Sequence, residues 1–172
     1  MPESISALDG CEDDLAQDAT GNAVTYEAAR AYDGDAGTAW RCPESPGSGR
    51  RFGLELVFSS PTSVRSVGAI PGYSKIDARY STLDRFVQNN RVTSAKWTCT
   101  TAAGETFSIK QAFQVTSRSL QRQVVKWEKC TRITFEVLDV VAGITQDVPG
   151  VGPQVPRDAT PISELEVQGW LL

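Results

Sequence analysis

Residues 92–100 read VTSAKWTCT, and this run shows most directly which kind of element builds the fold. Its side chains alternate, so that Ala95, Trp97 and Cys99 share one face of an extended strand while the polar residues between them face the other way. We therefore expect a strand with one buried face. On that face Trp97 is expected to be a structural core residue.

Five further short runs have the same β-branched and aromatic composition. They are 53–58, 64–70, 105–110, 131–138 and 162–168. Turn-forming sequences such as SSPTS, IPGY and TAAGE separate the runs, and few windows have helical periodicity. Many short strands with turns between them predict an all-β fold, an antiparallel β-sandwich or jelly roll.

The chain of 172 residues contains no histidine. This excludes Ser-His-Asp and Cys-His nucleophilic catalysis and the usual zinc and iron sites that use imidazole. The glycine-rich and serine-centred motifs of nucleotide-binding proteins and hydrolases are also absent, and no nucleophile stands with a base. We therefore expect a domain that is not an enzyme.

The net charge and the hydropathy of the chain exclude further classes of function. With 17 Lys and Arg against 21 Asp and Glu, the net charge is −4, so no broad basic field attracts nucleic acid or anionic lipid. No stretch approaches the roughly 18 apolar residues of a membrane span. We expect no nucleic-acid partner and no direct membrane insertion of this segment, although a secreted or membrane-anchored parent protein remains possible. The length suits one domain that buries roughly 70% of its unfolded surface.

The four cysteines are Cys11, Cys42, Cys99 and Cys130, and no two of them have CxxC spacing. An even number of widely spaced cysteines without a metal pattern favours two disulfides over four free thiols. Three pairings are possible. We favour Cys11 with Cys42 and Cys99 with Cys130, because the flanking segments could be neighbours in an antiparallel sheet. Disulfides would place the domain in an oxidising, extracytoplasmic setting.

Three connections, 41–52, 71–91 and 143–161, are longer than hairpin turns. Loops beyond about 12 to 15 residues in a compact domain tend to be functional or disordered. The second is rich in aromatic and charged residues, which predicts an ordered loop with one helical turn near 82–88. The third is rich in proline, lacks aromatic residues and is compatible with a mobile segment.

The most specific local motif is DGDAGTAW at 33–40. Asp33 and Asp35 stand two residues apart, glycines allow a tight turn, and Thr38 offers further oxygen atoms, as a hard cation such as Ca²⁺ requires. An EF-hand is excluded, because Thr38 occupies the loop position where that motif needs glycine. The alternative is a turn stabilised by its own aspartates.

Several pieces of sequence in the same order resemble one family. They are DGDAGTAW (33–40), GLELVF (53–58), VRSVGAIPGY (64–73) and ATPISELEVQGW (159–170). Together they are similar to the galactose-binding-like jelly roll of discoidin and coagulation-factor type C domains. More narrowly, PGYSK, DRFVQNNRV, AKWTC, the Gln111 region and ISELEVQG resemble discoidin-like modules of actinobacterial envelope proteins and the glycan-binding domain of streptococcal NAD-glycohydrolases.

The resemblance implies a structural calcium ion that joins the early loop to the last strand. Its ligands would be the carboxylates of Asp33 and Asp35, oxygens of Thr38 and the carboxylate of Glu164, with main-chain carbonyls completing the site. Trp40 would be a packing residue. The family pattern lacks the nearby Cys42, whose disulfide could brace the same loop and make the ion less necessary.

Ligands in such sandwiches are held by loops at one end, where aromatic faces stack on sugars and polar side chains bind hydroxyls. The residues we expect to contact a ligand are Tyr73, Lys75, Arg79, Tyr80, Asn89 and Arg91. An internal brace is the alternative role for Asn89 and Arg91, because their part of the motif recurs whatever the ligand. Arg41, Arg50 and Arg51 could extend the surface towards an anionic glycan.

The sequence thus predicts a non-catalytic, extracytoplasmic binding module for a cell-envelope glycan or related carbohydrate. The alternative is a protein-interaction or sensor ectodomain of an actinobacterial membrane protein, a kinase, flippase or division protein, that binds no sugar. In domain terms, residues 1–19 would be an N-terminal extension tied by Cys11, and residues 20–172 the discoidin-like β-sandwich.

Overall fold

The computed structural model describes residues 2–17, 21–43, 51–77, 80 and 82–171. Antiparallel strands make up most of the described chain, as predicted. They are β1 (Ser4–Ala7), β2 (Ala16–Gln17), β3 (Ala23–Val24), β4 (Trp40–Cys42), β5 (Gly53–Ile70), β6 (Arg91–Thr101), β7 (Thr106–Ala112), β8 (Gln121–Val141), β9 (Gln146–Val148), β10 (Gly152–Gln154), β11 (Thr160–Ile162) and β12 (Glu164–Leu171). The helical elements of the described residues are η1 (Leu8–Gly10), η2 (Ala28–Ala31) and α1 (Arg85–Gln88).

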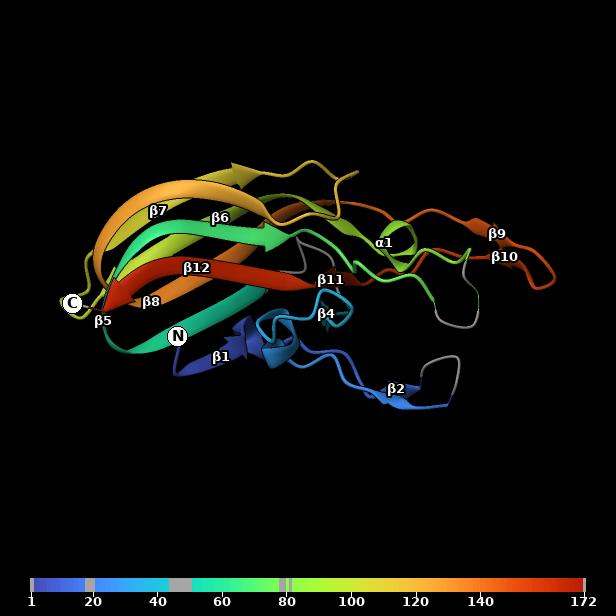
Figure 1. The fold of residues 1–172 in the computed structure, drawn as a ribbon, viewed down its shortest axis with the longest axis horizontal. Helices are drawn as coiled ribbons and strands as arrows, with labels where there is room; N and C mark the ends of the chain where they lie inside the picture. Colours follow the sequence, from blue (N-terminus) through green and yellow to red (C-terminus); the bar gives the residue numbers. More distant parts are fainter. Residues whose placement is uncertain (1, 18–20, 44–50, 78–79, 81, 172) are drawn as a thin grey trace.

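Two long strands, β5 and β8, run through both layers of a β-sandwich. They pair with each other along most of their length, with register shifts between Val57 and Ser66. The first half of β5 also pairs with β1 and its second half with β12, while β6 and β7 extend the sheet beyond the second half of β8. Figure 1 shows β5 and β8 curving round one end of the molecule, so that a single hydrogen-bonded sheet forms both layers.

The sequence prediction was wrong where it separated two strands by a turn at SSPTS, because β5 continues through residues 53–70. The pairing with β8 is interrupted between Val57 and Thr62, and Pro61 lies exposed in this interruption. A proline has no backbone N–H to donate, so it fits where the ladder is broken. The turn-forming composition therefore marks a bend within one strand.

The strand face predicted from the alternation is buried as expected. Ala95, Trp97 and Cys99 have no exposed surface, and the Trp97 ring packs on Phe135 with 4.6 Å between ring centroids. The buried indole Nε1–H of Trp97 donates to Gln111 Oε1 at 2.8 Å, which satisfies its only polar atom. Trp97 is therefore a core residue, as predicted.

Trp40 is a second core residue, as the resemblance implied. It is fully buried, and its indole Nε1–H donates to the main-chain oxygen of Cys11 at 2.9 Å. Leu54, Leu56 and Leu165 are also fully buried or nearly so. The motif at 33–40, which we call the cation motif, is therefore anchored in the core by its last residue.

The disulfides join Cys11 to Cys42 and Cys99 to Cys130, with Cα–Cα distances of 5.3 and 5.5 Å, which is the pairing favoured from the sequence. The second links β6 to β8, which are neighbours in the sheet. The first links the N-terminal segment to β4. Because β1 also pairs with β5, the described part of residues 1–19 is held by strand pairing as well as by Cys11.

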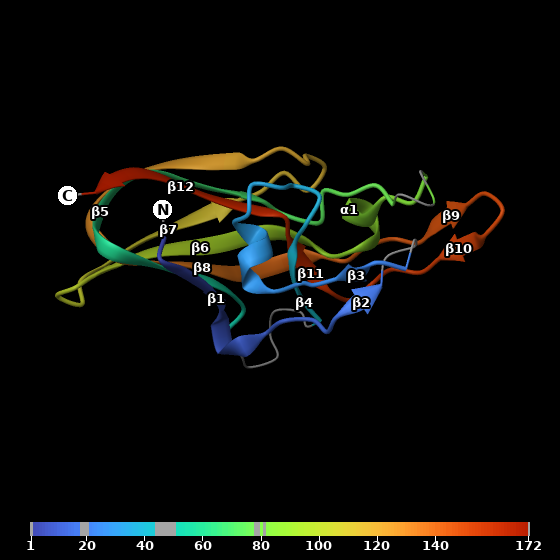
Figure 2. The same ribbon diagram turned by 60° about the horizontal axis from the view of Figure 1, so that its bottom comes forward.

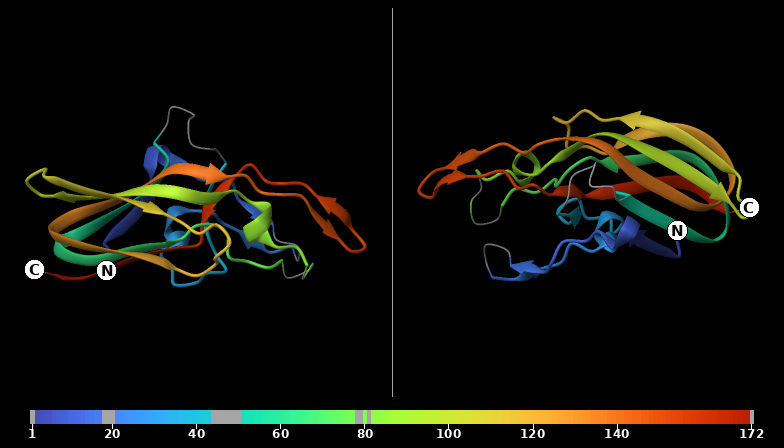
Figure 3. Two further views of the ribbon diagram at one scale, coloured as in Figure 1. Left: turned by 90° about the horizontal axis from the view of Figure 1, so that it is seen from above. Right: turned by 180° about the vertical axis from the view of Figure 1, so that it is seen from behind.

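The two ends of the molecule differ. The start of β1 and the end of β12 lie at one end, whereas α1, the β2–β3 pair and the β9–β10 hairpin lie at the other, as Figures 2 and 3 show. The β9–β10 hairpin occupies the connection 143–161, which the sequence left open as functional or mobile. No helix among the described residues is both long and apolar enough to cross a membrane.

Candidate functional site

The described residues of the loop 71–91 are held together by hydrogen bonds within the loop. Asp84 caps α1, because its carboxylate accepts from the backbone N–H groups of Phe86 and Val87 at 2.9 and 3.4 Å. Asp77 N–H donates to Leu83 O at 2.9 Å. At Gly72 a Cβ would lie 2.7 Å from the Phe86 ring, so only glycine fits beneath it. The predicted helical turn near 82–88 is therefore confirmed as α1.

A second segment, 155–157, packs against this loop. The Gln88 side-chain amide donates to Val155 O at 3.0 Å, and Arg157 N–H donates to Gln88 O at 3.0 Å. Asn89 Nδ2 donates to Arg85 O at 2.7 Å. These contacts bring Arg157, from the proline-rich connection, beside Arg85 of α1.

The loop-bearing end contains a small cavity of about 60 Å³ between the β2–β3 pair, β4, the loop 73–85 and Arg157. Four cations, one carboxylate and two tyrosines set its chemistry: Arg41, Lys75, Arg85, Arg157, Asp77, Tyr26 and Tyr73. We call it the arginine cavity. Ala16, Gln17 and Val24 complete its lining.

The two tyrosines form an aromatic wall. Their rings meet edge to face, with 6.3 Å between centroids and an interplanar angle of 87°. The Arg41 guanidinium lies 3.6 Å from the centroid of the Tyr26 ring, within the range of a cation–π contact. Burial, followed by the neighbouring Tyr26, raises the pKa of Tyr73 to about 12, so its hydroxyl stays protonated and can both donate and accept.

The cations of the cavity outnumber the carboxylates that neutralise them. Arg41 Nε pairs with Asp13 Oδ2 at 2.5 Å, and Arg85 Nη2 pairs with Asp77 Oδ2 at 2.5 Å. Within the described part of the chain, neither Arg157 nor Lys75 forms an ion pair with a carboxylate. The cavity therefore presents two positive charges that no described carboxylate pairs with.

The electrostatics of Arg157 reflect this imbalance. The residue as a whole is exposed, but desolvation of its guanidinium lowers the pKa of Arg157, and the charges of Arg85 and Arg41 lower it further. A guanidinium remains charged in any case. Its surroundings thus disfavour the positive charge, and an anion would relieve that cost.

A second cavity of about 170 Å³ adjoins the first, and we call it the loop cavity. It shares Val24, Tyr73 and Lys75 with the arginine cavity and extends to Gly37 and Thr38 of the cation motif. Tyr73 and Lys75 therefore form a wall common to both cavities.

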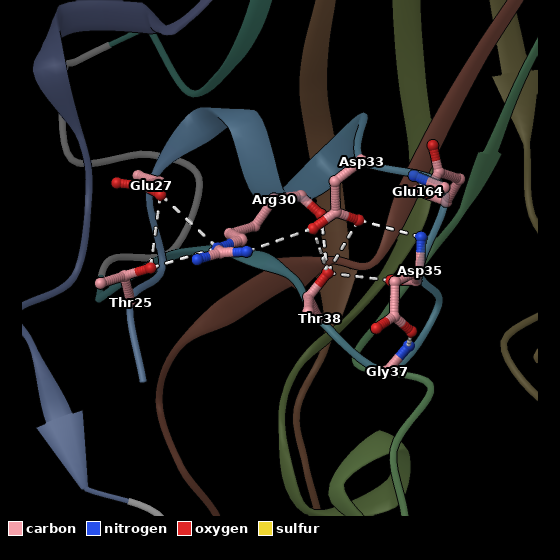
Figure 4. Close-up of polar contacts among 9 residues, drawn as sticks. Thr25, Glu27, Arg30, Asp33, Asp35, Gly37, Thr38 and Glu164 are labelled. Atoms are coloured by element: carbon pink, nitrogen blue, oxygen red, sulfur yellow. Dashed lines mark hydrogen bonds and ion pairs between the residues drawn. The ribbon is translucent and has the colours of Figure 1, made fainter. Parts of the chain in front are cut away.

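The cation motif folds so that oxygen atoms crowd round one hydroxyl (Figure 4). Thr38 Oγ1 lies 3.3 Å from Arg30 O, 2.9 Å from Asp35 O, and 3.0 and 2.8 Å from the two carboxylate oxygens of Asp33. A hydroxyl has one proton, so it can donate to only one of these four acceptors. Asp33 Oδ1 also accepts the Asp35 N–H at 2.9 Å, and Asp33 Oδ2 lies 3.6 Å from Arg30 Nη1, so groups of the chain already meet part of this cluster. Oxygen atoms of this kind are the ligands that Ca²⁺ binds.

The Asp35 carboxylate, expected to be a ligand, does not face Thr38 in this structure. It accepts the Gly37 N–H at 2.8 Å, so that only the main-chain oxygen of Asp35 faces the convergence (Figure 4). Consistent with this, no three acidic, cysteine or histidine side chains of the described residues form a group that could hold a metal. Apart from Glu164, any ion here would depend on Asp33, Thr38 and main-chain carbonyls.

Glu164 connects this loop to β12. Its Oε2 accepts the Gly34 N–H at 3.1 Å. Burial, together with the negative charges of Asp33 and Asp35, raises the pKa of Glu164 to about 7, against the lowering effect of the Gly34 hydrogen bond. The negative field that opposes ionisation of Glu164 would favour a cation.

Some of the ligand residues expected from the sequence line the cavities, and others do not. Tyr73 and Lys75 line both cavities, whereas Tyr80 lines neither of the two. Asn89 is fully buried and bonded to Arg85 O, and Arg91 Nη2 donates to Ala142 O at 3.2 Å, so both hold the loop together as the alternative role required. Arg79 and Arg50 lie outside the described residues.

Among the charged and aromatic residues of the arginine cavity, sequence reasoning missed two and did not single out a third. Tyr26 and Arg157 come from segments that no motif connected with the loop, and Arg85 was not distinguished from its charged neighbours. The one available signal was that Arg157 is the only cation in residues 143–161.

Comparison with known proteins identifies the fold. No protein-family model and no curated protein matches the sequence. Solved structures do match. An F5/8 type C domain from Bacteroides fragilis has 13% identity and a TM-score of 0.58, covering 99% of this chain and 100% of that one.

Carbohydrate-binding modules share the same architecture. The family 32 module of NanJ from Clostridium perfringens, solved with galactose, has 14% identity and a TM-score of 0.58 and covers 95% of this chain and 91% of that one. The corresponding module of AlyQ, solved with 4,5-unsaturated mannuronic acid, has 10% identity, a TM-score of 0.58 and coverages of 98% and 95%. The chain therefore has the galactose-binding-like β-sandwich fold of discoidin-type domains.

Proposed function

We propose that this domain is a non-catalytic carbohydrate-binding module whose ligand occupies the arginine cavity and the adjoining loop cavity. The observation on which this rests is the wall of Tyr73 and Lys75 between two cavities at the loop-bearing end. It combines an aromatic ring that is 3% exposed with an ammonium group 5.8 Å from the centroid of that ring. Aromatic rings with a few polar groups are the usual means of holding a sugar. The carbohydrate-binding modules among the structural neighbours support the same function.

Within this proposal the cation motif is a structural calcium site. Asp33, Thr38 and the main-chain oxygens of Arg30 and Asp35 would hold the ion, and Glu164 would close the site from β12. When bound, the ion would supply positive charge to these oxygen atoms. Its role would be to stabilise the loop that forms one side of the loop cavity.

The biological setting we propose is extracytoplasmic, with a cell-envelope glycan as ligand. The two disulfides support this setting, because such bonds persist in oxidising compartments. The 172-residue chain would be one module of a secreted or membrane-anchored parent.

A glycan array followed by calorimetry tests the proposal. We expect wild-type protein to bind a saccharide, and Lys75→Ala to weaken binding of that saccharide about tenfold or more, the cost of losing a charged hydrogen bond. Lys126→Ala is the matched control, because Lys126 lies exposed on β8 and lines neither cavity. Absence of binding across the array, or equal losses in both variants, would contradict the proposal.

One observation favours a second function, contact with a protein. The β9–β10 hairpin and its flanks expose three apolar side chains, Ile144, Val151 and Val155, at 54%, 46% and 69%. Apolar side chains gathered on a projecting hairpin are typical of an interaction surface. A flat glycan array together with loss of a protein partner in Val155→Asp would favour this function.

A further inference from the structure

We infer that the arginine cavity binds one oxyanion of an acidic saccharide, a carboxylate or a sulfate, while the sugar ring lies over the loop cavity. This inference rests on the proposed function, because it names the ligand class of the same site.

The sizes of the cavities support this division. About 60 Å³ holds a few water-sized groups, since one water needs about 10 to 15 Å³, and is far below the 300 Å³ or more of a pocket that encloses a whole small ligand. A single carboxylate or sulfate group matches the smaller space. The adjoining cavity of about 170 Å³ is the larger and shares the Tyr73 wall, so it suits the body of the sugar.

The charges that line the arginine cavity indicate that the ligand group bound there is negatively charged. Arg41 and Arg85 are each paired with a carboxylate, whereas Lys75 and Arg157 have no ion pair within the described residues. Unpaired cations beside two further guanidinium groups repel one another, and an oxyanion between them would convert that repulsion into attraction. A guanidinium also presents two parallel donors that match the geometry of a carboxylate or sulfate.

The arrangement is held rigidly before any ligand binds. Arg85 donates both to Asp77 Oδ2 and to Gln88 Oε1 at 2.6 Å, and Arg41 is clamped between Asp13 and the Tyr26 ring. Preorganised donors lose little conformational freedom on binding. Among the described residues no side chain clamps the Arg157 guanidinium in this way, so it is the cation most available to the ligand.

Matched probes test the sign of the group. Calorimetry would compare oligogalacturonate with its methyl ester, hyaluronan oligosaccharide with its carboxyl-reduced form, and chondroitin sulfate with its desulfated form. We expect at least one acidic probe to bind about tenfold or more tightly than its neutral or less charged partner, and its affinity to fall as NaCl is raised from low to physiological strength and beyond. The pair that shows the difference tells a carboxylate from a sulfate.

Variants at one position test the location. We expect Arg157→Gln to weaken the acidic probe about tenfold or more, Arg157→Lys to restore part of the affinity, and Lys126→Gln, which removes one exposed charge elsewhere, to change it less than twofold. The melting temperature of Arg157→Gln should equal or exceed that of wild type, because the variant removes a charge that its surroundings disfavour. A merely structural Arg157 would lower the melting temperature and leave the preference for acidic probes intact.

The outcomes separate the two proposals. Equal affinity for acidic and neutral partners, or an acidic preference that Arg157→Gln leaves unchanged, overturns the inference while the carbohydrate-binding function stands. Absence of binding by every saccharide overturns both.

Discussion

The cation motif and the arginine cavity adjoin each other at one end of the sandwich, yet they are built in opposite ways. The cation motif is acidic, and the oxygen atoms gathered at it come from residues 30–38, with one further carboxylate from Glu164. The arginine cavity is basic and draws its side chains from β2, β3, β4, the loop 73–85 and Arg157. One is a local feature of sequence, and the other exists only once the chain has folded.

The contrast indicates that the two regions have different roles, one in stability and one in ligand binding. We propose that the compact acidic turn binds a cation and that this ion stabilises the loop. The basic cavity is already held by ion pairs and an aromatic wall, so its surplus charge is available to a ligand. Substitutions in the cation motif should therefore leave the arginine cavity intact, and the reverse should also hold. Such variants test whether the two roles are separate.

The largest expected effect concerns calcium itself. At a Ca²⁺ concentration of about 100 times the dissociation constant, binding should stabilise wild type by about 2.7 kcal/mol, which raises the melting temperature by roughly 5 to 10 °C. Asp33→Ala should abolish this rise, because both Asp33 oxygens face the convergence. Differential scanning calorimetry with and without chelator measures it.

Asp35→Asn is the control for that experiment. Its main-chain oxygen still faces Thr38, and the new side-chain oxygen can still accept the Gly37 N–H. The calcium effect should survive. Loss of the effect in Asp35→Asn but not in Asp33→Ala would reverse the roles that the geometry assigns to the two aspartates.

The next largest effect concerns the free energy of unfolding, which should distinguish Arg41 from Arg157 in the same cavity. Arg41→Gln should lower the free energy of unfolding by about 2 kcal/mol, because Arg41 is 5% exposed and its removal leaves Asp13 without its partner. Arg157→Gln should lower it by nothing measurable. Urea denaturation compares them, and equal losses in both variants would show that Arg157 is as structural as Arg41.

A smaller effect is expected at Thr38. Thr38→Val keeps the shape of the side chain but removes the hydroxyl round which four oxygen atoms gather. We expect the affinity for Ca²⁺ to fall about tenfold, equivalent to about 1.4 kcal/mol. Isothermal titration with CaCl₂ measures the change, and an unaltered affinity would show that the hydroxyl is no ligand.

The smallest effect should couple the two regions. Because Gly37 and Thr38 line the loop cavity, an ordered cation motif should hold that cavity in its binding shape. We expect removal of calcium to weaken saccharide binding about threefold, a coupling of less than 1 kcal/mol. Saccharide titrations with excess Ca²⁺ and with chelator test this, and coupling of a hundredfold would mean that the ion touches the ligand directly.

The sequence predicted the fold well where local patterns determine structure. The alternation round Trp97, the helical turn after Asp84 and the pairing of Cys99 with Cys130 are all present. The turn predicted at SSPTS is a bend within β5, since composition alone does not distinguish an interrupted ladder from a reversal of the chain. The strand β8 also begins well before its predicted start.

The candidate site was predictable only in part. The cation motif is local in the sequence, whereas the arginine cavity is assembled from distant segments. The motif at 33–40 can be recognised in the sequence because the residues that supply its oxygen atoms are neighbours in the chain. Arg157 meets Arg85 only through hydrogen bonds of Gln88 to residues about 70 positions away, at separations that no local pattern encodes. Tyr73 and Lys75 were found because they lie together in an aromatic, charged loop.

The central claim is that a saccharide binds in the cavities on either side of Tyr73 and Lys75. Titration of isotope-labelled protein with the tightest saccharide of the array, followed by nuclear magnetic resonance, tests it most directly. We predict that the largest shifts fall on the Nε–Hε signals of Arg85 and Arg157 and on the backbone of Lys75. Shifts concentrated instead on the β9–β10 hairpin, with the signals of these three residues unmoved, would contradict it.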